Sequence, residues 1–459
     1  MTMPRLASAP RLWKRANTDA DLGEVEPKPR LVALLCFIVP ALPAYEVLPG
    51  PLRGNGSPAR LIAFMCFTLV VLAYFTTRKP RTRLRDVNPG VLIILLYFFL
   101  QLLTYATGLS LPGNAVIDSS KTRTLIVLVA DVGVALYVCQ TVRTVRQRSY
   151  VMGFLVAGLA FACFSGLLQG FTSLDIRALL VPPGFVEVID ASTLDDRGGA
   201  LRVVGTSEHA IEFGVLAAIT VPLAFHLARY AEKSLHRQLA TIACVLAFVV
   251  MPSAVSRSGA LALAVCMLIY MFTMRVRLLA NVVIIGMGLL LMMKIAAPNS
   301  INALWATFAG SKDDDSVISR TDDYQAVAEQ FKQHPWFGLG LGGYPPSVYR
   351  FLDNQWLQAV VQGGMIGVVA MSVLALGGAA GMTAGLRRAR SMRERDQLYA
   401  LGASFAGIMF SAFTFDLFSF QQATYVCFIL FALLWSVRHS SAATATSTGV
   451  APARPAGAR

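Results

Sequence analysis

Residues 312–367 carry the sequence KDDDSVISRTDDYQAVAEQFKQHPWFGLGLGGYPPSVYRFLDNQWLQAVVQGGMIG, in which acids, arginines, aromatics and glycines lie close together. The stretch from 298 to 367 that contains them is the longest part of the chain that is neither a plausible membrane span nor a terminal tail. We therefore expect much of the chemistry of this protein in this stretch.

The first part of this stretch predicts a helix. Thr321 is suited to cap it, and the two aspartates that follow oppose the positive end of the helix dipole. The pair His334-Pro335 is expected to end the helix. The glycines and prolines of residues 338–346 demand turns, and a new apolar span is expected from about Leu357.

The composition of the whole chain predicts a polytopic membrane protein. Among 459 residues, 55% are hydrophobic and only 14% are charged, and the mean hydropathy is +0.59, which is too apolar for a soluble globular protein of this length. The seven cysteines show no paired spacing, so neither a disulfide framework nor a zinc site is indicated. The basic first 30 residues lack an apolar core, so the first span is expected to be the targeting signal.

The apolar runs predict an all-α fold of about twelve transmembrane helices with a large extracytoplasmic loop, 298–356, between helices 9 and 10. Residues 31–437 then form the membrane domain, and residues 1–30 and 438–459 are expected to be disordered cytoplasmic tails. The expected spans are 31–49, 60–76, 90–107, 123–140, 150–169, 209–228, 238–255, 259–274, 278–297, 357–380, 398–415 and 420–437.

The distribution of charge predicts the orientation. With both termini in the cytoplasm, two thirds of the 40 lysines and arginines fall on the inner side, and every inner loop is basic. The formal net charge of +14 is then explained by membrane topology, and a nucleic-acid partner is not expected. Three irregular segments lie outside in this orientation: 170–208, the tight hairpin 253–258, and the loop 298–356.

Three arginines in these outer segments are candidates for substrate binding. Arg202 precedes the sixth span, Arg257 lies in the hairpin, and Arg320 precedes the predicted loop helix. The planar guanidinium makes bidentate contacts with phosphate oxygens, so three of them near helix ends are suited to bind a diphosphate. The alternative is that each arginine extends toward lipid headgroups or pairs with a loop acid.

Asp353 lies at the outer end of the tenth span and is the candidate general base. A partly buried carboxylate can take a proton from a sugar hydroxyl, and its neighbours Asn354, Gln355 and Trp356 are candidates for substrate contact. The alternative is that Asp353 is the N-cap of that span.

Other polar residues allow narrower expectations. Asp131 lies at mid-span, where an acid should face the interior of the bundle. Glu208 and His209 open the sixth span and are expected either to contact a polar substrate or only to cap the helix. If Asp353 is no more than a cap, the base is to be sought at Glu208, His209 or Asp416. The histidines are too scattered for a metal site.

The chain resembles the O-antigen ligase and polymerase superfamily of bacterial membrane glycosyltransferases. The resemblance covers about residues 200–380 and rests on RVVG at 202–205, VSRSG at 255–259, and the run SRTDDY, HPWFGLG, DNQWLQ and GGMIG between 319 and 367. It implies about twelve spans of a GT-C-like fold and arginines that hold the diphosphate of a polyprenyl-linked glycan. Ligases of this family have a histidine where this chain has Asp353, which weakens an assignment as a lipid A core ligase. A polymerase, or a ligase for another acceptor, fits equally well.

The function that the resemblance and these residues predict is glycan transfer from a polyprenyl diphosphate carrier to an acceptor hydroxyl at the outer face of the bacterial cytoplasmic membrane. The partners are the lipid-linked donor, a glycan or glycolipid acceptor and the bilayer, and no cofactor or metal is expected. A flippase or transporter for lipid-linked glycans is the alternative, which predicts broken helices and polar groups deep in both halves. A structural scaffold is the third possibility.

Overall fold

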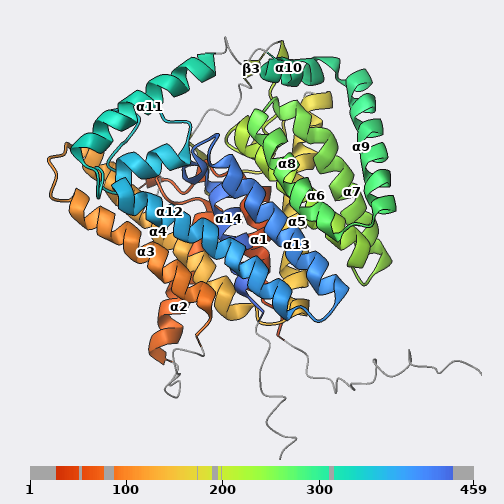
Figure 1. Ribbon diagram of the computed structural model, residues 1–459, viewed down its shortest axis with the longest axis horizontal. Helices are drawn as coiled ribbons and strands as arrows, with labels where there is room; N and C mark the ends of the chain where they lie inside the picture. The colour runs from red at the N-terminus through yellow and green to blue at the C-terminus, as the bar shows by residue number, and fades with distance from the viewer. Residues whose placement is uncertain are drawn as a thin grey trace, which may run out of the picture.

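The computed structural model describes residues 27–50, 54–76, 87–172, 174–188, 195–197, 199–309 and 315–437, with the side chains of 197 and 315–322 outside this description. Both predicted tails therefore lie largely outside the described residues. The described part of the chain is all-α, as predicted, with fourteen α-helices and two small antiparallel sheets (Figure 1).

The helices follow one another along the chain, and the two longest connections lie between α5 and α6 and between α11 and α12. Their bounds are α1 Arg30–Ala41, α2 Pro58–Thr76, α3 Pro89–Gly108, α4 Ala115–Thr141, α5 Val145–Thr172, α6 Ala210–Tyr230, α7 Ser234–Val250, α8 Arg257–Tyr270, α9 Val276–Ala296, α10 Pro298–Ala309, α11 Asp315–Gln333, α12 Gln355–Arg388, α13 Met392–Ser411 and α14 Gln421–Trp435. A short 3₁₀ helix, η4 (Met251–Ala254), joins α7 to α8, and a second, η6 (Leu417–Ser419), precedes α14. The strands pair β1 (Glu46–Val47) with β2 (Val186–Glu187) and β3 (Asp196–Arg197) with β4 (Ala200–Leu201).

Each of the twelve expected spans overlaps a helix, although α1 ends at Ala41 and residues 46–47 of the first expected span form β1. The structure does not confirm twelve membrane crossings. Among the described residues, eight helices are long and apolar enough to cross a membrane by length and composition. Three shorter apolar helices begin at Arg30, Arg257 and Gln421. The chain is thus a polytopic membrane protein, and the number of crossings remains a prediction.

Side-chain caps explain where several helices begin. Asn88 caps α3 ahead of Pro89, and Asn114 caps α4. At α12 the cap is Asn354, whose Oδ1 accepts the backbone N–H of Trp356 at 2.9 Å. The alternative in which Asp353 caps this helix is therefore wrong, because the cap lies one residue later.

Helix α11 differs from its predicted start. It begins at Asp315, so Thr321 lies inside the helix and is not its cap. The predicted end is confirmed, because α11 ends at Gln333 immediately before His334-Pro335.

Helices α14 and α6 form the centre of the bundle. Every residue of α14 from Gln421 to Leu434 is buried. In α6, 83% of an apolar stretch of 18 residues is buried. The same share is only 6% for α9 and 22% for α2, which lie at the periphery (Figure 1). A helix of fifteen residues such as α14 can serve as a core because its neighbours cover all of its faces.

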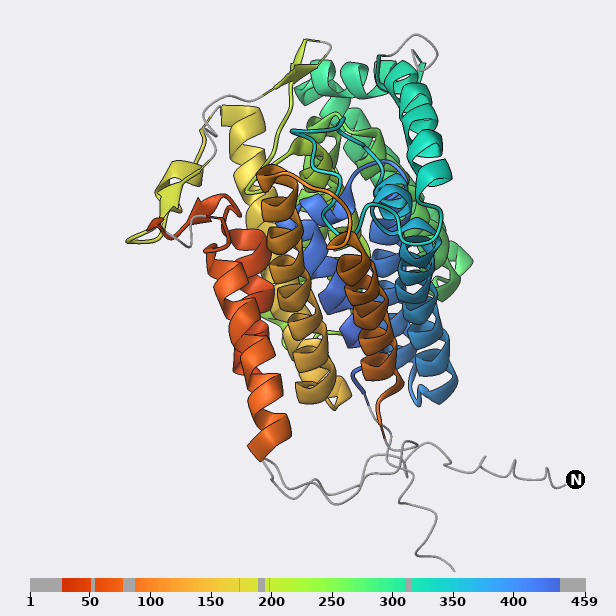
Figure 2. The same ribbon diagram turned by 90° about the vertical axis from the view of Figure 1, so that its left-hand side faces the viewer.

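The irregular segments gather at one end of the bundle. Figure 2 shows α10 and α11 together with the β3–β4 sheet beyond the ends of the long helices. We call this the loop end, defined by η4, α10, α11 and residues 334–354. The opposite end, defined by the α6–α7 and α12–α13 junctions, is called the far end. The β3–β4 sheet, η4 and α10 come from the three segments predicted to share one face of the membrane, and they lie together at this end.

Helix α12 is broken at Gly364, where φ is 56° and ψ is −144°. A Cβ at this position would lie 2.6 Å from the carbonyl oxygen of Pro335, so only glycine fits without displacement of the backbone. The carbonyl of Pro335 accepts the N–H of Met365 at 2.9 Å, and that of Trp336 accepts the N–H of Ile366 at 3.1 Å. The segment after α11 therefore caps the second half of α12 at the break.

Candidate functional site

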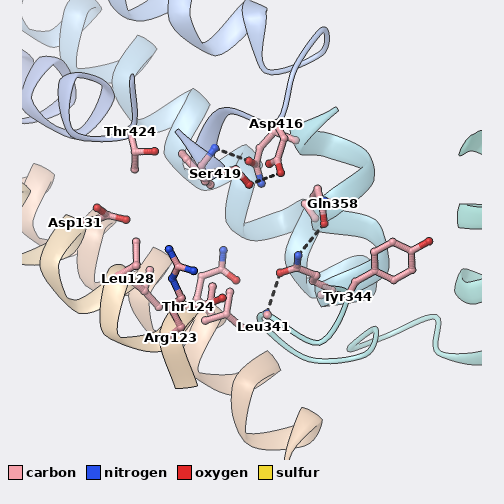
Figure 3. Close-up of a pocket in the computed structure, with 18 of the residues that line it drawn as sticks. Arg123, Thr124, Leu128, Asp131, Leu341, Tyr344, Gln358, Asp416, Ser419 and Thr424 are labelled. Carbon is pink, nitrogen blue, oxygen red and sulfur yellow. Dashed lines mark hydrogen bonds between the residues drawn. The ribbon is translucent and has the colours of Figure 1, made fainter. Parts of the chain in front are cut away.

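A polar cavity of about 380 Å³ opens at the loop end and extends into the bundle. Its walls are α3, α4, α12 and α14, the first turn of α2, the loop 341–346 and the loop 416–419. Figure 3 shows α4 on one side of this cavity, with α12 and the loop 416–419 across from it. Because the walls come from distant parts of the chain, packing of the bundle creates the cavity.

Two arginines line the α2 and α4 side of the cavity. Arg60 is buried at the start of α2, and its Nη1 donates to the carbonyl of Gly54 and to Oδ1 of Asn55, each at 3.1 Å. Arg123 is more exposed and projects from α4 into the cavity (Figure 3). The two guanidinium groups make this side suited to bind an anion.

Glu208 lies close to both arginines. Burial raises the pKa of Glu208, and the positive charges of Arg60 and Arg123 offset part of that rise. The backbone N–H of Glu208 donates to Oε2 of Glu212 at 3.1 Å, and Oε1 of Glu212 accepts the N–H of Ala423 at 2.9 Å. The start of α6 is therefore tied to α14 beside the cavity.

Asp416 lines the cavity opposite Arg123 (Figure 3). Its pKa is raised to about 7, chiefly by burial; a hydrogen bond from Ser419 lowers it in part, and the charge of nearby Asp353 raises it. A carboxyl group with a pKa near 7 is suited to exchange protons at neutral pH. Asp353 is the neighbour of this group and does not belong to the lining of the cavity in the described part of the chain.

The loop 341–346 is held against α3 and α4 by close backbone packing. Gly340 has a φ of 87°, and a Cβ there would lie 2.4 Å from Cα of Gly108. Lys121 is buried, and its Nζ donates to the carbonyl of Gly108 at 2.7 Å. Glycine at 340 therefore permits the approach that closes this wall.

Two of the predicted arginines, Arg202 and Arg257, do not belong to the lining of this cavity in the described residues. Arg202 is buried, its Nε donates to the carbonyl of Ala254 at 3.4 Å, and its Nη1 lies 4.0 Å from Oδ2 of Asp195. Arg257 begins α8, three residues after Ala254. The structure thus places both arginines next to η4. The side chain of Arg320 lies outside the description.

His209 lies at the start of α6, near Arg202. Burial and the nearby charge of Arg202 lower the pKa of His209 to about 4. Its Nδ1 accepts the N–H of Ile211 at 3.1 Å, which makes it the cap of α6, and its ring lies 5.9 Å from that of Phe420. A neutral histidine that accepts a backbone N–H is a helix cap and a poor base.

The neighbours of Asp353 have separate roles. Gln355 lines the cavity, Asn354 caps α12, and the ring of Trp356 stacks on that of Phe413 at 5.1 Å. Gln355 also joins α12 to the loop that carries Asp416, because its N–H donates to the carbonyl of Ala412 at 2.9 Å.

Arg60 and Arg123 were missed by sequence reasoning. Arg60 and Arg123 are the first residues of the expected spans 60–76 and 123–140, at the loop end of each. Arg202 similarly precedes the sixth span at its loop end. That shared position was the available signal.

A metal centre is not apparent in the described residues, which contain no group of three or more His, Cys, Asp or Glu arranged to hold an ion. The side chains that could hold a charged ligand are the arginines of the cavity and of the η4 region.

Comparison with known families assigns the central part of the chain. Residues 242–372 match a family model described as O-antigen ligase, and a comparison with curated proteins finds no match. The matched region runs from α7 into α12 and includes the loop 341–346 and the turns of α12 that form one wall of the cavity. The chain is therefore a multi-pass membrane protein that carries an O-antigen ligase domain.

Proposed function

We propose that the protein transfers a glycan from a polyprenyl diphosphate carrier to an acceptor hydroxyl at the outer face of the bacterial cytoplasmic membrane. One observation carries this proposal. The O-antigen ligase domain forms one wall of a polar cavity whose other walls carry two arginines and a carboxyl group with a pKa of about 7. Anion binding and proton exchange are the two tasks that this transfer requires.

The arginines would stabilise the leaving group. When the bond between the sugar and the diphosphate breaks, negative charge develops on the phosphate oxygens, and positioned guanidinium groups lower the energy of that state. Arg60 and Arg123 would do this in the cavity. Arg202, Arg257 and Arg320 would hold the diphosphate as it enters from the η4 side.

The carboxyl pair would supply the base. Asp416 is the member that lines the cavity, so its carboxylate would accept the proton of the acceptor hydroxyl as the new glycosidic bond forms. Asp353 would act on Asp416 through its charge, which helps to raise the pKa of Asp416. This exchanges the roles expected from the sequence, in which Asp353 was the first candidate.

The loop end would face the extracytoplasmic space, with both termini in the cytoplasm. Fusion of a reporter enzyme after Ala309, at the end of α10, should give activity outside the cell membrane. Fusion after Arg390, at the α12–α13 junction, should give activity inside. Activity on the same side for both fusions would contradict the orientation.

A transporter for lipid-linked glycans is the second candidate, and the broken helix α12 favours it. The break occurs in one helix next to the cavity. A transporter moves substrate between two compartments, so it has no product to form in detergent micelles, whereas a transferase does.

The test is glycan transfer by the purified protein in detergent. Lipid-linked glycan from a deletion strain, which should accumulate when transfer is lost, is mixed with the protein and its acceptor fraction. We expect a product of higher mass together with released polyprenyl diphosphate. If the deletion strain lacks polymer but the purified protein shows no transfer in detergent, the transporter is favoured.

A further inference from the structure

We infer that the inner part of the cavity, between Gln358 and Asp131, is a binding subsite for one uncharged sugar ring of the lipid-linked glycan. The inference rests on the proposed function and adds the group that the cavity recognises. It comes from a set of side-chain amides whose orientation is determined by hydrogen bonds within the protein.

The amide of Gln358 has a defined direction. The backbone N–H of Gly342 donates to Oε1 of Gln362 at 2.9 Å, and Nε2 of Gln362 donates to Oε1 of Gln358 at 2.7 Å. A backbone N–H can only donate, so it determines which atom of Gln362 is the acceptor and, in turn, which atom of Gln358 is. Gln358 can therefore offer its Nε2 donor to a ligand in the cavity that it lines (Figure 3).

Gln355 is oriented in the same way. The backbone N–H of Phe418 donates to Oε1 of Gln355 at 2.7 Å, which directs Nε2 of Gln355 to other partners. Gln355 and Gln358 project from adjacent turns of one helix face, three residues apart, so their two donors lie on one wall. Two preoriented amide donors are suited to the hydroxyl or acetamido oxygens of a sugar.

Acceptors lie across the cavity. Asp131 is just over two helical turns beyond Arg123 along α4, a rise of about 12 Å. Nearby Gln101 donates through Nε2 to the hydroxyl of Tyr97 at 3.3 Å, so Oε1 of Gln101 is the atom that can accept. A ring bound here would donate its hydroxyl protons to these oxygens, below a diphosphate held at Arg60 and Arg123.

The size and polarity of the cavity support a single ring. Its volume of about 380 Å³ is near the lower end of the ~300–1,000 Å³ that small-molecule sites occupy. A polymer would therefore extend out of the cavity, and an isoprenoid tail would not enter, because the inner wall carries amides and a carboxyl group. An acidic sugar is disfavoured because its negative charge would oppose the ionisation of Asp416, which the proposed transfer requires.

The experiment compares ligands that differ only by the sugar. Binding of farnesyl diphosphate and of its glucose, galactose and N-acetylglucosamine diphosphate esters to the purified full-length protein is measured by calorimetry in detergent. We expect at least one ester to bind about tenfold more tightly than farnesyl diphosphate, as one or two added hydrogen bonds allow.

The variant Gln358→Met should remove this tenfold gain and leave the affinity for farnesyl diphosphate unchanged. Gln358→Glu keeps an oxygen that accepts the hydrogen bond from Gln362 and removes the Nε2 donor. It takes the place of Gln358→Met if the methionine variant does not fold. Gln140→Leu, at the far end of α4, is the matched control and should keep the gain.

Equal affinity for all four ligands, or a gain that survives in both Gln358 variants, would overturn the subsite while transfer activity remains. Failure of every ligand to bind, together with no transfer, would overturn the proposed function and the subsite with it.

Discussion

The two ends of the bundle both bury polar side chains, but they use them differently. At the far end, Asp396 accepts a hydrogen bond from the hydroxyl of Tyr270 at 2.7 Å, contacts Nδ1 of His226 at 2.6 Å and pairs with Arg229. Close by, Nε of Arg148 donates to Oε1 of Gln397 at 2.8 Å. At the loop end, comparable groups surround a cavity of about 380 Å³.

This difference indicates that the polar groups at the far end stabilise the bundle, whereas those at the loop end are available to bind a ligand. The partners of Asp396 come from α6 and α8, so the far-end cluster joins three helices. The polar groups of this cluster form their hydrogen bonds with one another. The loop-end groups are oriented by some protein partners and keep donors and acceptors directed at the cavity. The first arrangement holds the bundle together, and the second is prepared for a ligand.

The largest effect on chemistry should come from the loop end. Asp416→Asn keeps the shape of the side chain and removes the carboxylate, so transfer should fall on the order of a hundredfold to ten-thousandfold. Donor binding, measured with farnesyl diphosphate, should stay near that of the unchanged protein. Near-normal turnover of this variant would return the role of base to Asp353.

The largest effect on stability should come from the far end. Asp396→Ala leaves Arg229 and Tyr270 without their shared acceptor, and loss of one partner of a buried ion pair costs about 3–5 kcal/mol. Thermal unfolding in detergent should show a lower midpoint, while kcat and KM of the folded fraction should not change. A change in KM with no loss of stability would show that the far end also takes part in binding.

The arginines should give intermediate losses. Replacement of Arg60 or Arg123 by Ala removes a charge-assisted contact to phosphate, so transfer should fall roughly tenfold to a hundredfold, and Lys should restore only part. Arg202→Ala, Arg257→Ala and Arg320→Ala test the set expected from the sequence. Product levels are compared at matched protein levels. Normal transfer in both cavity variants would place the diphosphate on the η4 side alone.

The smallest effect concerns pH. Asp416 must be deprotonated to accept a proton, so transfer should rise with pH through the pKa of about 7. The negative charge of Asp353 raises that pKa, so Asp353→Asn should lower it and move the acid limb of kcat/KM to lower pH. Profiles between about pH 5 and 9 measure the shift. Loss of transfer at every pH would identify Asp353 as the base.

Several local features followed from short stretches of sequence. The helix end at Gln333 was predictable because the following His334-Pro335 pair acts through its immediate neighbours. The cap of α12 was misplaced by one residue, because Asp353 and Asn354 are both good caps and their backbone angles decide between them. The break at Gly364 depends on the carbonyl of Pro335, a contact between segments that local patterns do not contain.

The sequence by itself determined the membrane class and the approximate positions of the apolar helices. These depend on hydropathy and on charge, which act residue by residue. Only the tertiary structure decided that α14 is central, that α9 is peripheral, and that Arg60, Arg123 and Asp416 share one cavity. The physical reason is that faces toward lipid and faces toward other helices are equally apolar, so the pattern along a span does not reveal its neighbours.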